Sequence, residues 1–156
     1  MLSTALTQAL QTQIGYELSA SQTYLGMAAY FHAQNLNGWA KFFEAQAAEE
    51  REHALKIFHF LLETGSPTKL PAIPEAPVQY ASALETVQKS LEQEQKVTKS
   101  FQNMAATALK EADLTGFGFL QWFLAEQVEE EATFERLIAL IESGINLFQA
   151  EALLGS

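Results

Sequence analysis

All four prolines of this chain lie in one fifteen-residue stretch, residues 66–80, which reads SPTKLPAIPEAPVQY. Proline has no backbone N–H and breaks helix interiors, so we predict that this stretch is extended. The sequence on both sides carries apolar residues three or four apart, the spacing of a buried helix face. A stretch of this length reaches up to about 50 Å, whereas a helix of 25 residues is about 38 Å long. It can therefore run the length of a helical bundle, and the helices that it joins can be parallel.

The hydrophobic pattern predicts an all-α fold, namely a four-helix bundle with one long crossover between its second and third helices, plus a short C-terminal helix. A turn around Asn35, Asn37 and Gly38 makes the first two helices antiparallel neighbours, and Gly65 is expected to follow the end of the second. The length fits one domain, residues 1–156. The expected bundle helices are 4–33, 39–64, 82–111 and 115–143, and the expected short helix is 146–154.

The composition limits which partners the chain can bind and which kinds of metal site it can form. The formal charge is −10, from 19 acidic and 9 basic residues, which argues against nucleic acid and favours cationic partners. No run of about 18 apolar residues appears, so we expect no membrane partner. The N-terminal stretch does not resemble a secretory signal, so we expect a cytoplasmic protein. Zero cysteines exclude disulfides, thiolate zinc sites and iron–sulfur clusters, so any metal must be held by oxygen and imidazole.

Each predicted bundle helix carries one glutamate in its core-facing stripe, near the middle of the helix. Glu50 precedes His53 by three residues, so both side chains leave the same helix face about one turn apart and can bind one small cation. Burying a carboxylate without compensation is costly, and these stripes contain no Lys or Arg. Protons could neutralise the cluster, but two divalent cations would balance four carboxylates and would also explain the histidine. The four glutamates are Glu17, Glu50, Glu94 and Glu130.

An oxygen-rich site with one imidazole suits iron or manganese better than structural zinc. Two such metals bridged by a carboxylate can pass two electrons to dioxygen, so redox chemistry is the natural hypothesis. Tyr24 follows Glu17 by seven residues, and two interpretations remain open: a core aromatic residue, or a redox-active or ligand-orienting group. Gln127 lies one turn before Glu130, where it could supply a neutral ligand or a hydrogen bond to a bridging oxygen.

These residues resemble a non-haem bacterial ferritin over nearly the whole chain. The resemblance is carried by Glu17, Tyr24, the E-E-x-E-H motif from Glu49 to His53, Glu94, and the segment FLQWFLAEQVEEE over residues 119–131. It implies the ferritin-like bundle and a ferroxidase centre at which dioxygen or hydrogen peroxide oxidises Fe(II). It also implies self-assembly into a hollow homo-oligomeric cage of 24 subunits, inside which Fe(III) is stored as a mineral.

Carried over residue by residue, the resemblance implies two irons in each subunit. The first would be bound by Glu17, Glu50 and His53. Glu50 would bridge to the second iron, which Glu94 and Glu130 also hold, with Gln127 beside it. Tyr24 and Trp122 would be nearby aromatic residues able to donate electrons.

The resemblance also implies a third iron position, matched by Glu49, Glu126 and Glu129. From the residues alone, these three are equally well interpreted as a solvated acidic strip. Haem is not expected, because Gln127 and Glu130 replace a second E-x-x-H and no methionine stands where a haem ligand would be needed. Two other functions stay open: a non-storing di-metal oxidase or scavenger of oxygen or peroxide, and a structural bundle whose carboxylates are protonated.

Overall fold

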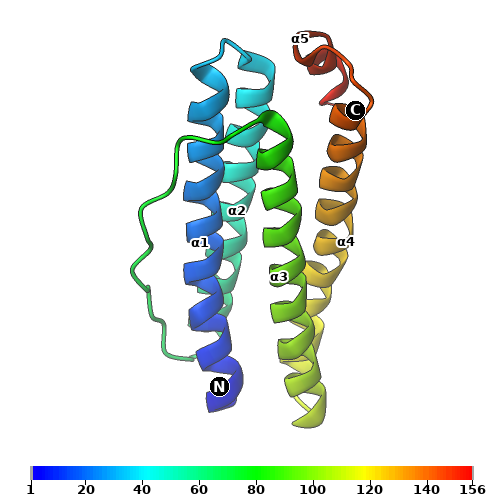
Figure 1. The fold of residues 1–156 in the computed structure, drawn as a ribbon. Helices are drawn as coiled ribbons and strands as arrows, with labels where there is room; N and C mark the ends of the chain where they lie inside the picture. Colours follow the sequence, from blue (N-terminus) through cyan, green and yellow to red (C-terminus); the bar gives the residue numbers. More distant parts are fainter. Residues whose placement is uncertain (1, 156) are drawn as a thin grey trace.

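The computed structural model describes residues 2–155 and confirms the predicted all-α bundle (Figure 1). The four long helices pack side by side, α1 and α4 running in one direction and α2 and α3 in the other (Figure 1). Residues 1 and 156 of the expected domain lie outside the described part. The helices are α1 Thr4–His32, α2 Asn37–Glu63, α3 Ala83–Lys110, α4 Leu114–Glu142 and α5 Leu147–Ala150, followed by the 3-10 turn η1 Glu151–Leu153.

The proline-rich crossover, residues 64–82, runs in an extended path along the outside of α1 (Figure 1). Its carbonyl groups accept hydrogen bonds from α1, as where Gln11 Nε2 donates to the Pro67 oxygen at 2.7 Å. The crossover approaches α1 so closely at Gly26 that a Cβ at this position would clash with the Pro77 carbonyl, so a glycine is required. Because the crossover spans the bundle lengthwise, α2 and α3 are parallel, as the sequence predicts.

The turn between α1 and α2 corrects one prediction. The chain reverses over residues 33–36, where Asn35 adopts a left-handed conformation with φ of 60°. Asn37 and Gly38, predicted to be in this turn, already belong to α2. The reversal is complete at Asn35, so the helix begins two residues before the predicted position 39. At the other end of α2, Gly65 follows the helix with φ of 67°, as expected.

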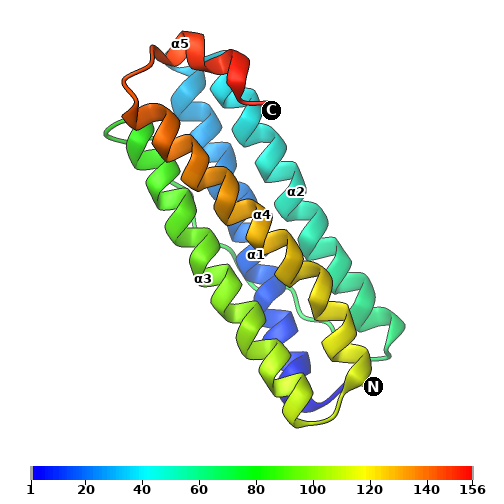
Figure 2. The ribbon, with the colours of Figure 1, turned by 90° about the vertical axis from the view of Figure 1, so that its right-hand side faces the viewer.

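The C-terminal segment folds across the start of α2 (Figure 2). The backbone N–H of Trp39 donates to Glu151 Oε2 at 2.9 Å, and its indole Nε1 donates to the Leu147 carbonyl at 3.0 Å. The first N–H groups of a helix have no partner within it, so the Glu151 carboxylate supplies one from outside. This contact fastens the end of the chain to the first helix pair.

Buried polar side chains divide the core into two apolar clusters, one toward each end of the bundle. The cluster near the C-terminal segment includes Tyr24, Phe31, Trp39, Phe43 and Phe134. The cluster at the opposite end includes Leu6, Leu10, Ile57, Phe101 and Phe123. No helix among residues 2–155 is long and apolar enough to cross a membrane. The polar layer between the clusters is therefore the part of the interior that packing alone does not explain.

Candidate metal centre

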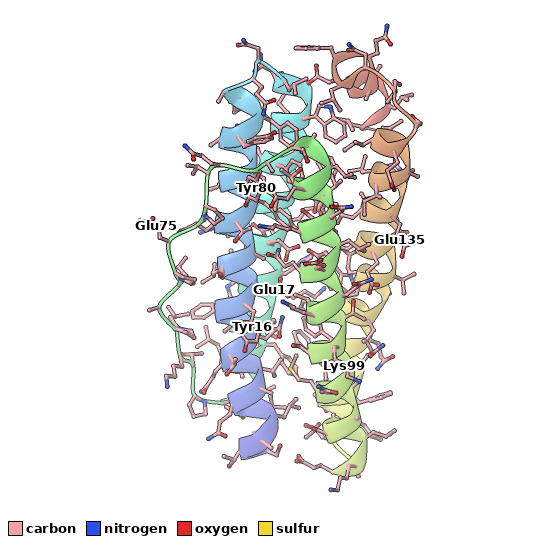
Figure 3. The ribbon with its side chains drawn as sticks, in the orientation of Figure 1. Tyr16, Glu17, Glu75, Tyr80, Lys99 and Glu135 are labelled. Atoms are coloured by element: carbon pink, nitrogen blue, oxygen red, sulfur yellow. The ribbon has the colours of Figure 1, made fainter. Side chains whose placement is uncertain are left out.

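The polar layer contains the four predicted glutamates and the histidine, all buried. Glu17 and Glu94 are 0% exposed, Glu50 is 1% exposed, and Glu130 is 6% exposed. His53 is 4% exposed. Glu17 lies between the helices near mid-height, whereas Glu75 and Glu135 lie on the outside (Figure 3). The helical period places one acid from each long helix at the same depth, as the stripes of the sequence predict.

The five side chains form two groups that could each hold a metal ion. In the first group, one ligand atom from each of Glu17, Glu50 and His53 lies within 4.8 Å of the others. The second group joins Glu50, Glu94 and Glu130 within the same limit. Glu50 belongs to both groups, so its two oxygens can face two neighbouring cations.

Several side-chain atoms of this cluster that could bind a metal ion are buried and have no hydrogen-bond partner. They are Glu17 Oε2, Glu50 Oε1, Glu130 Oε2 and His53 Nδ1. Buried polar atoms in folded proteins are nearly always paired, so unpaired acceptors gathered at one place indicate a missing positive partner. Oxygen and imidazole donors without sulfur fit iron or manganese. The residues present therefore fit a pair of such ions.

Three neutral side chains hold two of these carboxylates in place. Tyr24 Oη donates to Glu94 Oε1 at 2.6 Å, and Gln127 Nε2 donates to Glu94 Oε2 at 3.0 Å. Gln13 Nε2 donates to Glu17 Oε1 at 3.1 Å. Tyr24 is thus buried in the core, and its hydroxyl contacts one of the acids. The sequence analysis missed Gln13, although its position one helical turn before Glu17 was a usable signal.

The pKa values of three carboxyl groups in the cluster are raised above their ordinary values. Burial raises the pKa of Glu50 well above its ordinary value, and the hydrogen bond and charge of Glu17 add to this effect. Burial likewise raises the pKa of Glu94. Burial and the charge of Glu94 raise the pKa of Glu130 to about 9. Without metal, the Glu130 carboxyl group retains its proton at neutral pH, and a bound cation would displace it.

The pKa values of Glu17 and His53 shift in the directions that favour their charged forms. Burial alone would raise the pKa of Glu17, but its contacts with Glu50 and His53 outweigh burial and lower it. Burial alone would lower the pKa of His53, but Glu17 outweighs burial and raises it. His53 Nδ1 lies 3.9 Å from Glu17 Oε2 and 3.4 Å from Glu50 Oε2.

The three acids predicted for a third iron lie at different distances from the centre. Glu126 Oε2 is 3.6 Å from His53 Nε2, and the Glu126 side chain is 26% exposed. Glu49 is exposed on α2 and lies close enough to Glu130 to contribute to its raised pKa. Glu129 is exposed on α4. The structure thus brings Glu49 and Glu126 to the edge of the centre, whereas Glu129 lies at the surface.

Trp122 also touches the centre. Its ring packs edge to face against the His53 ring, with centroids 5.4 Å apart. The Lys56 ammonium lies 3.6 Å from the centroid of the Trp122 ring, a cation–π contact. Trp122 is 41% exposed, so it connects a buried ligand to the protein surface.

The chain is similar to known proteins in both sequence and fold. Residues 7–143 match the family model of the ferritin-like domain. A bacterial non-heme ferritin of Staphylococcus aureus (strain MRSA252) is 42% identical over 135 residues, covering 86% of this chain and 81% of the relative. An open pore ferritin from the hyperthermophilic archaeon Archaeoglobus fulgidus superposes with a TM-score of 0.95 at 35% identity, covering 99% of this chain and 98% of the other. A humanized archaeal ferritin superposes with a TM-score of 0.94 at 32% identity, covering 99% and 97% of the two chains.

Proposed function

This chain belongs to the ferritin family, and on that premise we propose that it is an iron-storage ferroxidase. Two Fe(II) ions bind in each subunit as substrate, are oxidised to Fe(III), and move on to a ferric mineral. The mineral is enclosed by a homo-oligomeric cage of 24 copies of the chain. The similarity to other ferritins supports iron storage and cage assembly, and the buried cluster supports iron binding within the single subunit.

The two groups of the cluster suggest how the ions are held. Glu17, Glu50 and His53 bind the first Fe(II), and Glu50 bridges to the second, which Glu94 and Glu130 complete. Iron binding displaces the protons that burial retains on Glu50 and Glu130. Gln127 acts through the Glu94 carboxylate, to which its amide nitrogen donates.

The oxidation balances with two electrons for each pair of irons. Two Fe(II) ions, one dioxygen and two protons give two Fe(III) ions and one hydrogen peroxide, and hydrogen peroxide can serve as oxidant in turn. Tyr24 and Trp122 lie close enough to the ligands to supply further electrons. Glu49, Glu126 and Glu129 are proposed as a third iron position close to the centre.

A single observation carries this proposal: four buried carboxylates from four helices gather in two groups that could each hold a metal ion, and three of them have a buried oxygen without a hydrogen-bond partner. A structural bundle has no need of such an arrangement, because apolar residues of similar size would fill the space at lower cost. A purely structural role therefore leaves the unpaired acceptors without an explanation.

The test combines native mass with iron content after aerobic addition of Fe(II). We expect a 24-subunit mass and far more than two irons retained for each chain. Retention that stops near two would favour the non-storing oxidase or scavenger, and no retention would favour the structural bundle. Glu130→Ala should slow the initial oxidation by about 10-fold or more, since even partners of metal ligands change activity by about 10–100-fold. The exposed Glu135→Ala on the same helix is the matched control, and equal rates in the two variants would remove Glu130 from the centre.

A further inference from the structure

We propose that Gln13 is a positioning residue that keeps Glu17 a single-oxygen ligand of the first metal position. The inference rests on the proposed function, because it concerns how that centre binds its ions. Gln13 lies on α1 one turn before Glu17 and is 1% exposed. A glutamine so deeply buried must direct its amide at a definite partner.

That partner is one oxygen of the Glu17 carboxylate and not the other. Gln13 Nε2 donates to Glu17 Oε1 at 3.1 Å. Glu17 Oε2 has no hydrogen-bond partner and lies 3.9 Å from His53 Nδ1. The amide therefore occupies the oxygen that points away from the histidine and leaves free the oxygen that faces it.

Of the four acids, only those on α1 and α3 accept hydrogen bonds from neutral side chains. Both oxygens of Glu94 on α3 accept hydrogen bonds from neutral donors, Tyr24 and Gln127. Among the described residues, no amide or hydroxyl donor reaches the carboxylates of Glu50 or Glu130, which belong to α2 and α4. Glu17 and Glu94 are thus held by neutral side chains before metal arrives, whereas Glu50 and Glu130 are not.

The chemistry of an amide suits this task. A glutamine side chain carries no charge, so it orients Glu17 without competing with a cation for the negative charge. An N–H group that occupies Oε1 opposes binding of one ion through both oxygens, and it prevents the carboxylate from rotating about its last torsion. A ligand held in one orientation binds with less loss of conformational freedom.

The experiment measures metal binding rather than turnover. The full-length, assembled, metal-free protein is titrated with Co(II) without oxygen, and the visible absorption of the bound cobalt is recorded. The background variant Glu130→Ala removes a ligand of the second position only, so that the first position is observed alone. In this background, Gln13→Met replaces the amide with an apolar chain of similar length.

We expect Gln13→Met to weaken Co(II) binding at the first position by about 10–100-fold, the usual effect of losing a partner of a metal ligand. The absorption intensity should also change, because Glu17 becomes free to bind through both oxygens. Gln11→Met is the matched control, since its amide donates to the Pro67 carbonyl in the crossover and should leave the cobalt spectrum unchanged.

Gln13→Asn provides an independent second variant, because it keeps a polar amide that is too short to reach Glu17. If Gln13→Met does not fold, the same loss in Gln13→Asn supports the proposal. Wild-type affinity and spectrum in the folded variants would overturn it while the centre itself stands. Absence of Co(II) binding in the unsubstituted protein would overturn the proposed function together with this inference.

Discussion

The charge state of Glu130 gives the sharpest quantitative prediction, made for the metal-free protein. Burial and the charge of Glu94 raise the pKa of Glu130 from 4.5 to about 9 in the folded state. When the pKa of a carboxyl group is higher in the folded state than in the unfolded state, its contribution to stability is fully present below the unfolded-state pKa. This contribution is lost as pH rises through the folded value. The window of loss is therefore pH 4.5 to about 9, and stability falls as pH increases within it.

The magnitude follows from proton linkage. Within the window the folded chain holds one proton more than the unfolded chain at this site, so the free energy of unfolding falls by about 1.4 kcal/mol for each pH unit. Between pH 6 and pH 8 the loss amounts to about 2.7 kcal/mol. For a chain of this length, that loss lowers Tm by about 5–11 °C. Glu130→Gln carries no ionisable group at this position, so it should lack this part of the decline.

The assay is thermal unfolding of metal-free wild type and Glu130→Gln at pH 6 and pH 8, with a chelator present. The quantity of interest is the difference between the two pH dependences, because effects on other groups and on assembly are common to both proteins. Glu135→Gln, at an exposed position of α4 (Figure 3), is the matched control and should behave as wild type. Equal pH dependence in all three proteins would refute the assignment of a retained proton to Glu130.

Two further predictions concern a hydrogen bond of Tyr24 and the packing of the crossover against Gly26. Tyr24→Phe removes the hydroxyl that donates to Glu94 Oε1 but keeps the aromatic ring, so metal affinity at the second position should fall by about 10–100-fold in a Co(II) titration. Unchanged affinity would show that the hydroxyl does not orient Glu94. Gly26→Ala would place a methyl group against the Pro77 carbonyl, so denaturant unfolding should show a loss of about 1–3 kcal/mol, the usual cost of overpacking. Its control is Gly118→Ala, where a Cβ meets open space and should stabilise α4 by about 0.5–1 kcal/mol; a loss at both positions would count against the clash.

The fold could be predicted because its signals are local and agree with one another. Confinement of proline to one stretch and apolar spacing of three or four elsewhere leave few arrangements other than a bundle with one crossover. The sequence predicts the start of α2 two residues too late, because asparagine and glycine, found at positions 37 and 38, are typical of turns. The side chain that caps this helix start, Glu151, is 112 residues away from Trp39 in sequence. No local pattern carries that information.

The candidate site shows the same division between local pattern and three-dimensional contact. A helical stripe shows that Glu17, Glu94 and the other two acids face inward, because depth along each helix follows from residue number. It does not show which oxygen of each carboxylate is occupied. That depends on where neighbouring side chains end, as with Tyr24, which comes from another helix than Glu94. Gln13 is the exception, since it shares a helix and a face with Glu17 and could have been found from spacing alone.

The two acids that accept hydrogen bonds from neutral side chains are also the two least exposed acids of the cluster. Glu17 on α1 and Glu94 on α3 are held by neutral donors and are 0% exposed. Glu130 on α4 lacks such a donor and is the most exposed of the four acids, and Glu126 beside His53 is exposed by about a quarter. The side of the centre formed by α1 and α3 is therefore closed and hydrogen-bonded, whereas Glu126 and Glu130 on α4 form a more open, acidic edge. A cation approaching the centre from this side would meet the acidic edge first, because its negative charge attracts cations.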